Sequence, residues 1–349
     1  MSVLPAASRT RQRVIVLVLT VCALLALAAA GLAGSVPVPV ADLPQALASV
    51  LSGAPDTMSA TLLDLRLGRA SAAFATGAAL ALAGVMMQAL VRNPLADSYV
   101  LGVSAGAAVG ALAALLFGAA LWMVDLGALA GAVGISLLLY LLARRDLGGG
   151  RSSGREAVRT GESGVLLLTG VVLASACMAL VTLMLSVAPE SRLRGMVFWM
   201  IGDLAGASWR LLPWIVLGLA VLLALRRARA LNVMALHADA AVALGIDVGA
   251  QRRFLFLCSG LLTACAVTTG GSIGFVGLVV PHACRHAFGP DHRILLPAAT
   301  LVGGSFLVVA DTLARTVLAP QQLPVGVLTS LIGVPVFLFQ LHQLHLRRR

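Results

Sequence analysis

Two histidines are the residues of this chain whose types and spacing come nearest to metal chemistry. His282 and His286 stand four residues apart, so on a helix they would share one face and could bind a metal ion or a haem iron. No carboxylate completes an HExxH pattern, and Pro281 with Arg285 gives the segment the character of a helix end. The pattern therefore favours a structural role, and we expect neither a bound metal nor a cofactor.

Charged residues give little further support for catalysis. Asp311 and Arg315 stand one helical turn apart and could pair with each other. No Ser/His/Asp arrangement and no pair of carboxylates stands out. All 25 basic residues are arginines, which excludes a phosphate-binding loop ending in Gly-Lys, a Schiff base and a lysine general base. We expect a protein without catalytic activity, in which another chain performs any nucleotide hydrolysis that drives it.

The composition indicates a membrane protein. Of the 349 residues, 60% are hydrophobic and 11% are charged, whereas a soluble domain carries about 25% charged residues. The net charge of +11 could suggest nucleic acid, but the arginines lie between apolar runs and read as membrane topology signals. The five cysteines lie in apolar stretches without a CxxC pair, so they indicate neither a disulfide framework nor a zinc site.

Apolar stretches predict an all-α, polytopic membrane protein that forms a single domain over residues 1–349. A helix needs about 20 apolar residues to cross about 30 Å of hydrocarbon. Ten stretches are candidates: 14–33, 70–91, 100–121, 126–143, 165–187, 211–225, 254–269, 273–288, 294–313 and 325–341. Arginines at both ends of the chain place both termini in the cytoplasm. We interpret the first stretch as a retained helix rather than a signal peptide, because it is long and no clear cleavage context follows.

The connections carry three further patterns. Residues 144–164 are rich in Gly and Arg and are typical of a solvated linker. Residues 43–51 form an amphipathic patch that could lie along the membrane surface. Residues 226–253 are polar and cytoplasmic, with a short helical pattern over 233–244 that Gly245 ends.

The apolar spans contain regularly spaced small residues and one repeated Gly–Arg spacing, which we call the internal echo. Glycine recurs at every fourth position over 102–110, which allows helix backbones to approach closely in lipid. Gly84 and Arg92 stand eight residues apart, and Gly277 and Arg285 repeat that spacing, a weak hint of an inverted repeat. Charges within the spans are scarce, which argues against coupling to an ion gradient.

Long ordered motifs now point to a family. The segment from Gln88 to Asp97, QALVRNPLAD, followed by LGVSAG, strongly resembles the signature of FecCD-type permeases, which import iron siderophores, haem and vitamin B12. The segments GFVGLVVPH with Arg285, GPDHR, ADTLAR, LPVGV and GVP continue the resemblance almost to the end of the chain. It covers the chain from the second span to the last.

The resemblance implies the type II ABC importer permease fold and a set of partners. Such a subunit pairs with a second copy of itself or a close relative, with the cargo path along the dimer axis. Two ATP-binding cassette ATPase subunits bind at the cytoplasmic face, and a periplasmic or lipid-anchored binding protein docks on the outside. The protein would lie in the inner, or cytoplasmic, membrane among lipid, with no nucleic acid partner.

The resemblance also implies three groups of site residues. The cytoplasmic gate is assigned to Asn93, Pro94, Leu95, Ser163 and Gly164. Contact with the ATPase is assigned to the coupling segment within 226–253, at Leu236, Ala240, Leu244, Gly245, Ile246 and Asp247. Docking of the binding protein is assigned to Arg66, Arg69 and Arg315. Two departures from the family pattern stand out: Gly68 replaces a proline and should loosen the helix start, and Ser163-Gly164 is a smaller pair than two hydroxyl residues.

We therefore predict a permease subunit of an ATP-driven importer for a bulky metal chelate, with ferric siderophore or haem placed first. The alternative is the same machine importing cobalamin. An ion-coupled secondary carrier or channel is a third interpretation, which uptake abolished by an ionophore would favour. A membrane anchor without a path of its own would tolerate bulky substitutions at Asn93 or Leu95.

Overall fold

The computed structural model of the chain describes residues 9–34, 36–147, 162–207, 210–236 and 238–348, and over these ranges it contains helices and no strand. This confirms the all-α class predicted from the apolar pattern. Most of the expected 144–164 linker falls on residues 148–161 and lies outside the described residues. The helices are α1 (Arg9–Leu32), α2 (Leu43–Leu51), α3 (Met58–Val91), α4 (Val103–Leu116), α5 (Leu121–Leu147), α6 (Glu162–Val187), α7 (Glu190–Ile201), α8 (Leu211–Leu236), α9 (Ala238–Ala243), α10 (Val248–Gly270), α11 (Val276–Phe288), α12 (His292–Thr316) and α13 (Val325–Arg348), with 3-10 turns η1 (Val40–Asp42) and η2 (Ser98–Leu101).

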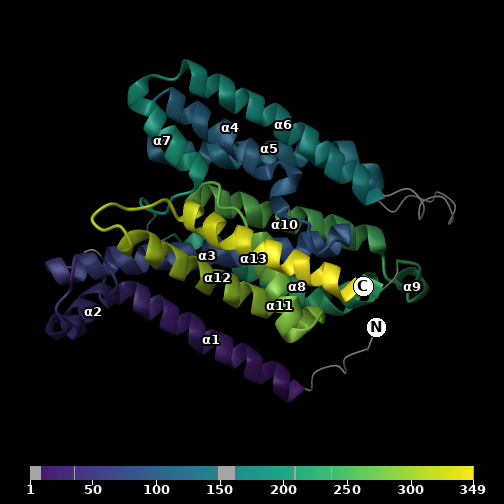
Figure 1. Cartoon of the computed structure of the whole chain (residues 1–349), viewed down its shortest axis with the longest axis horizontal. Coiled ribbons are helices and arrows are strands. Elements are labelled where there is room, and N and C mark those ends of the chain that lie inside the picture. Colours follow the sequence, from purple (N-terminus) through teal and green to yellow (C-terminus); the bar gives the residue numbers. More distant parts are fainter. Residues whose placement is uncertain (1–8, 35, 148–161, 208–209, 237, 349) are drawn as a thin grey trace.

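Helix α3 forms the centre of the bundle. Helices α10 and α12 pack along it, α4 to α7 lie to one side, and α1 lies on the other (Figure 1). In its most apolar stretch 94% of α3 is buried, against 17% for α1 and 22% for α6, so α3 contacts protein where those two helices are left to face lipid or a partner.

The two ends of the bundle carry different elements. The start of α1, the end of α13 and α9 lie together at one end, which we call the α9 end (Figure 1). Helix α2 and the connection between α12 and α13 lie at the opposite, α2 end. An even number of membrane crossings requires the first helix to begin and the last helix to end on the same side, as the start of α1 and the end of α13 do.

Helix lengths modify the expected set of ten crossings. Over the described residues, seven helices are long and apolar enough to cross a membrane: α1, α3, α5, α6, α8, α10 and α12. The other three expected spans are shorter. Helix α4 has 14 residues, the apolar part of α13 is Val325–Gln340, and α11 has 13 residues or about 20 Å, less than the hydrocarbon thickness of about 30 Å.

Left-handed backbone positions account for the short helices. Gly102, with φ +75°, ends η2 and makes α4 begin at Val103. Gly271 at φ +70° and Phe275 at φ +69° break the chain between α10 and α11. A phenylalanine in this region is strained by about 1–3 kcal/mol and persists only where packing fixes it. Gly333 of α13 supplies that packing, since a Cβ at Gly333 would lie 2.5 Å from Cβ of Phe275.

Two expected helix boundaries are wrong. Helix α8 continues to Leu236, past the expected end at residue 225, because residues 226–231 are strong helix formers without Gly or Pro. The predicted helix over 233–244 is therefore divided between the end of α8 and the short α9. Helix α3 begins twelve residues before the expected residue 70, where Thr57 caps it by accepting from the amide of Ala60 at 3.1 Å. Gly68 thus lies inside the helix and does not loosen its start.

Two helices lie on connections. The amphipathic pattern over 43–51 is confirmed as α2, which buries Ala46 against Ala60 and Leu63 of α3. Helix α7 was not expected, because the sequence after residue 187 mixes polar and apolar residues without a long apolar run.

Glycines set the closest helix crossings, as the small-residue pattern predicts. Gly77 of α3 packs on Gly303 of α12, and Gly106 of α4 packs on Gly131 of α5. The two glycines of the internal echo, Gly84 and Gly277, contact each other where α3 crosses α11. Close backbone approach of this kind is what holds helices together in lipid.

We predict that Gly84→Ala destabilises the protein by about 1–3 kcal/mol. A Cβ at this position would lie 1.9 Å from the carbonyl oxygen of Gly277, so α3 and α11 must move apart. Thermal unfolding of the detergent-purified protein measures the effect. The matched control is Gly218→Ala in α8, where a Cβ meets no atom within 4 Å. Equal melting temperatures for the two variants would contradict the proposed crossing.

Candidate functional site

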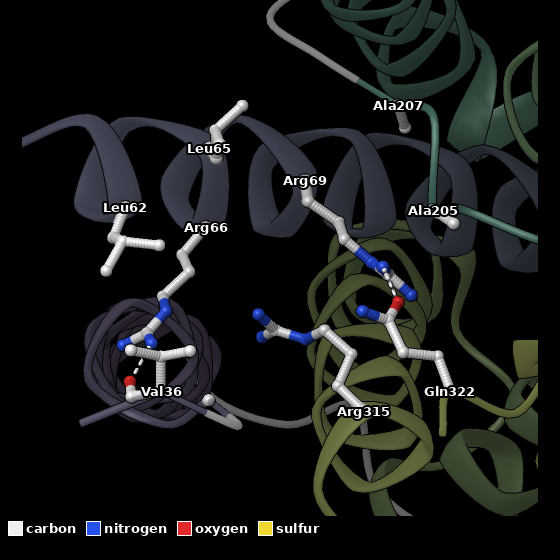
Figure 2. A pocket seen from close by; sticks show the side chains of 10 residues that line it. Val36, Leu62, Leu65, Arg66, Arg69, Ala205, Ala207, Arg315 and Gln322 are labelled. Carbon is white, nitrogen blue, oxygen red and sulfur yellow. Dashed lines mark hydrogen bonds between the residues drawn. The ribbon is translucent and has the colours of Figure 1, made fainter. Parts of the chain in front are cut away.

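Three arginines meet in a pocket at the α2 end of the bundle. Arg66 and Arg69 stand three residues apart on α3, and Arg315 comes from the last turn of α12 (Figure 2). We call these three residues the arginine cluster. The pocket encloses about 230 Å³, and Gln322 lines it as well. The structure therefore brings together the three residues that the family resemblance assigns to docking.

Asp311 is the carboxylate that permits two of these arginines to be buried. It is 1% exposed, and Arg69 donates to it from Nε at 3.0 Å and from Nη2 at 2.8 Å. Arg69 also donates from Nη1 to Oε1 of Gln322 at 2.8 Å. The expected pair of Asp311 with Arg315 is present but looser, with Nε 3.4 Å from Oδ2. Arg69 forms the closer ion pair with Asp311, because two nitrogens of its planar guanidinium group contact the carboxylate.

Arg66 has carbonyl partners. It donates from Nη1 to the carbonyl oxygen of Leu32 at 3.1 Å, and from Nη2 to that of Val36. These contacts place its guanidinium at the C-terminal end of α1, where the helix dipole favours a cation. They leave the charge without a paired carboxylate among the contacts of Arg66. With one carboxylate and three guanidinium groups, the cluster carries a net charge of +2.

The expected gate turn follows α3 directly. Arg92 adopts a left-handed conformation at φ 54° and ends the helix, and Asn93 Oδ1 accepts from the amide of Leu95 at 2.9 Å. Pro94 fits such a turn because it cannot continue a helix. Asn93, Pro94 and Leu95 are all exposed. The helix break predicted from the Asn-Pro pair is thus present.

The second half of the expected gate lies at the start of α6. Gly164 is exposed in the first turn, and a Cβ there would meet nothing within 4 Å. The side chain of Ser163 lies outside the described part of the structure. Helix α6 packs on η2, the element that follows the gate turn, with Gly170 carbonyl oxygen 3.3 Å from a Cβ built on Gly102. The two halves therefore belong to neighbouring elements.

Polar contacts beside the gate turn were not found by sequence reasoning. Asp97 caps η2 by accepting from the amide of Tyr99 at 3.3 Å, and its Oδ1 lies against Gly277 at the start of α11. Burial raises the pKa of the Asp97 carboxyl above its ordinary value, because the charged form is desolvated there. Nearby, Arg285 of α11 donates to Oε1 of Gln88 at 2.9 Å. These contacts attach the gate turn and the end of α3 to α11.

The expected coupling segment occupies the α9 end. Leu236 ends α8, Ala240 lies within α9, and neither side chain is among those the structure describes. Gly245 adopts φ +76°, and the amide of Ile246 donates to the carbonyl of Ala241 at 2.9 Å to close the turn. Asp247 caps α10 by accepting from the amide of Ala250 at 2.8 Å.

Two large apolar side chains of this segment are exposed. Val242 is 63% exposed and Leu244 is 70% exposed, although both are large aliphatic side chains. Such residues at the tip of a bundle are typical of a surface that a partner covers.

His282 and His286 face each other on α11. Their Nε2 atoms lie 3.1 Å apart, a distance that one hydrogen bond between a donor and an acceptor nitrogen explains. Among the described residues, no group of three or more His, Cys, Asp or Glu side chains could hold a metal ion.

Comparisons with known proteins agree on one family of transporters. Residues 17–343 match the FecCD transport family. The sequence is 40% identical over 300 residues to the cobalamin import system permease protein BtuC of Halobacterium salinarum, covering 84% of this chain and 77% of that protein. It is 40% identical over 283 residues to the vitamin B12 import system permease protein BtuC of Escherichia coli O127:H6, covering 80% and 82%.

Solved structures show the same fold. An inward-facing ABC transporter described as of the metal-chelate type matches with a TM-score of 0.79 and 28% identity, covering 95% of this chain and 99% of that chain. PsaBC from Streptococcus pneumoniae matches with a TM-score of 0.52 and 16% identity, covering 84% of this chain and 94% of that one.

We predict that Asp311→Asn destabilises the protein by about 3–5 kcal/mol, because it leaves Arg69 and Arg315 buried without a carboxylate. Thermal unfolding in detergent measures the change. Asp125→Asn is the matched control: its pair with Arg210 spans 2.8 Å but both side chains are about one-third exposed, so we expect a loss of at most about 1 kcal/mol. A similar loss in both variants would show that Asp311 does not hold the cluster.

Proposed function

This chain belongs to the FecCD transport family, and we propose that it is the permease subunit of an ATP-driven, binding-protein-dependent importer of cobalamin. One observation carries the role of the subunit: the chain presents a buried, positively charged pocket at the α2 end (Figure 2) and the exposed apolar side chains of Val242 and Leu244 at the α9 end. A transport subunit that binds one partner on each side of the membrane needs two such surfaces.

Cobalamin replaces siderophore and haem as the first candidate cargo. Expectation from the family alone placed the iron chelates first, because they are the commoner cargoes of the family. Both relatives described above, each 40% identical to this chain, are named for cobalamin or vitamin B12 import, which supports the alternative. A ferric chelate is the second candidate, supported by the neighbour of the metal-chelate type at 28% identity.

The arginine cluster is our proposed docking site for the binding protein. Arg66 is bonded to carbonyl oxygens, and its charge adds to a net charge of +2 in a pocket of about 230 Å³. An acidic side chain of the binding protein would form charge-assisted hydrogen bonds there in a site already screened from water. The α2 end would then face the outside of the cell.

The gate and the coupling segment follow from this orientation. We infer that Asn93, Pro94 and Leu95, with Ser163 and Gly164, form a constriction that closes the path at the α9 end. The exposure of Asn93, Pro94, Leu95 and Gly164 in the single chain suits an opening shared by two copies of the permease around one axis. Two ATPase subunits would each receive Val242 and Leu244 of one copy, together with the turn formed by Gly245, Ile246 and Asp247. This chain itself would hydrolyse no nucleotide.

Ion-coupled transport is the competing class of function. A carrier of that class needs a charged or polar group within the membrane that binds and releases its ion. The buried carboxylate of α12, Asp311, is already bonded to Arg69 and Arg315. We therefore place the energy source in the ATPase partner.

Uptake into proteoliposomes tests the proposed function. With the ATPase and the binding protein present, we expect radiolabelled cyanocobalamin to accumulate only when ATP is supplied, and to continue to accumulate in the presence of an ionophore. Haem and a ferric hydroxamate, each presented with its own binding protein, should enter more slowly. Faster entry of either iron chelate would transfer the assignment to it, and uptake abolished by the ionophore would favour ion coupling.

Arg66→Gln tests the docking site. The amide retains a hydrogen-bond donor for the carbonyls of α1 but removes the charge, so we expect the affinity for the binding protein to fall about tenfold, or about 1.4 kcal/mol. Surface plasmon resonance on the permease in nanodiscs, at two salt concentrations, measures the affinity and its dependence on salt. Arg210→Gln is the control, because Arg210 pairs with Asp125 and does not line the pocket. Unchanged affinity in Arg66→Gln would place the docking site elsewhere.

A further inference from the structure

A three-residue contact fastens α8 to the start of α12 at the α9 end. Asn232 Oδ1 accepts from the backbone amide of His292 at 2.8 Å and from its ring Nδ1 at 2.7 Å. Asn232 Nδ2 donates to Oδ1 of Asp291 at 2.7 Å. We call Asn232, Asp291 and His292 the Asn232 joint. The oxygen and the nitrogen of one amide are thus both committed to the same neighbouring helix start.

The partners of Asn232 are themselves fixed. Asp291 is the N-cap of α12, and its Oδ1 also accepts from the amide of Arg293 at 2.9 Å. His292 is 4% exposed. Because Asn232 offers an oxygen to Nδ1, that nitrogen carries the proton, and the buried Nε2 is left as an unpaired acceptor. The ring is therefore held in one tautomer and one orientation by Asn232.

The joint connects the two surfaces of the proposed importer. On one side, Asn232 lies four residues before the end of α8 at Leu236, and α9 follows after one further residue. On the other side, α12 is continuous from His292 to Thr316 despite Pro297, a length of about 37 Å. Its far end carries Asp311 and Arg315, which belong to the pocket of the arginine cluster.

Helix α12 does not move alone. It packs along α3 through Gly77 and Gly303, whose backbones are in direct contact, and through Phe74 against Gly304. At the α2 end Arg69 of α3 is bonded to Asp311 of α12. A displacement of the start of α12 is therefore shared by the helix that carries Arg66 and Arg69.

We propose that the Asn232 joint transmits the movement of residues 238–247 to α12, and through α12 to the arginine cluster. The proposal rests on the proposed function, since it needs an ATPase at the α9 end and a binding protein at the α2 end. Asn232 acts as a positioning residue: it contacts no cargo, and it makes α8 and α12 move as one body. A fastening with only a structural role would affect stability and assembly but not the cargo imported for each ATP hydrolysed.

Asn232→Asp breaks the joint while conserving size. It places a carboxylate against that of Asp291, where the amide nitrogen now donates at 2.7 Å. In proteoliposomes holding permease, ATPase and binding protein, we expect hydrolysis to continue and the cyanocobalamin imported per ATP to fall about fivefold or more, the range of coupling factors between protein sites. If this variant does not assemble, Asn232→Ser, whose shorter side chain lacks the amide nitrogen that donates to Asp291, takes its place with the same expectation.

Exchanging the side chains at positions 232 and 291 should restore the contact and the import per ATP. In the double variant Asn232→Asp with Asp291→Asn, the side-chain amide at 291 donates to the carboxylate at 232. That carboxylate still accepts from the backbone amide and from ring Nδ1 of His292. We expect import per ATP to return to within about twofold of wild type. Asp125→Asn, the same substitution as at position 291 but in a pair that is about one-third exposed, serves as the control and should leave the ratio unchanged.

Two results would overturn the proposal: an unchanged ratio in Asn232→Asp or Asn232→Ser, or a lowered ratio that the exchange does not restore. Uptake by the wild-type complex tests the proposed function separately from the joint. If wild-type complex imports another chelate and not cyanocobalamin, the cargo assignment is wrong, and the ratio of variant to wild type is then measured with that chelate.

Discussion

Backbone contact between glycines is the constraint on which this structure depends. Lipid offers no water to exclude, so helices within it associate through close packing rather than through the hydrophobic effect. Helix α3 meets α12 at Gly77 and Gly303 and meets α11 at Gly84 and Gly277. A Cβ at Gly77, Gly84 or Gly303 would collide with a carbonyl oxygen or a neighbouring methyl group. These crossings make α3 the buried centre of the chain and fix the direction of α12 beside it.

The polar sites follow from this packing. Because α3 and α12 lie side by side over most of their length, Arg69 and Asp311 face each other at the α2 end and exclude water from their ion pair. At the other end, the start of α12 lies against the last turns of α8, where Asn232 binds it. The same two helices therefore contribute to both surfaces that we assign to partners, so the geometry of one surface constrains that of the other.

Local chemistry was predictable from the sequence, and contacts between distant segments were not. The Asn93-Pro94 break, the α2 amphipathic patch and the long apolar helices each depend on residues close in the chain. The preference of Asp311 for Arg69, 242 positions away, depends instead on the rotation of α3 against α12, which no spacing rule supplies. Asn232 gave no signal because its partners lie 59 and 60 positions away. The echo of Gly84 and Gly277 was visible, but not that the two residues touch.

We propose that the two surfaces are coupled through α12 in both directions, so that a partner bound at the α2 end also alters the activity of a motor at the α9 end. The most direct measurement is the ATP hydrolysis rate of the complete complex in nanodiscs, titrated with the cargo-loaded binding protein, where both faces are accessible and no transport is required. The account predicts that the rate changes with the occupancy of the docking pocket and saturates with it. A hydrolysis rate that stays constant while the binding protein is demonstrably bound would contradict it.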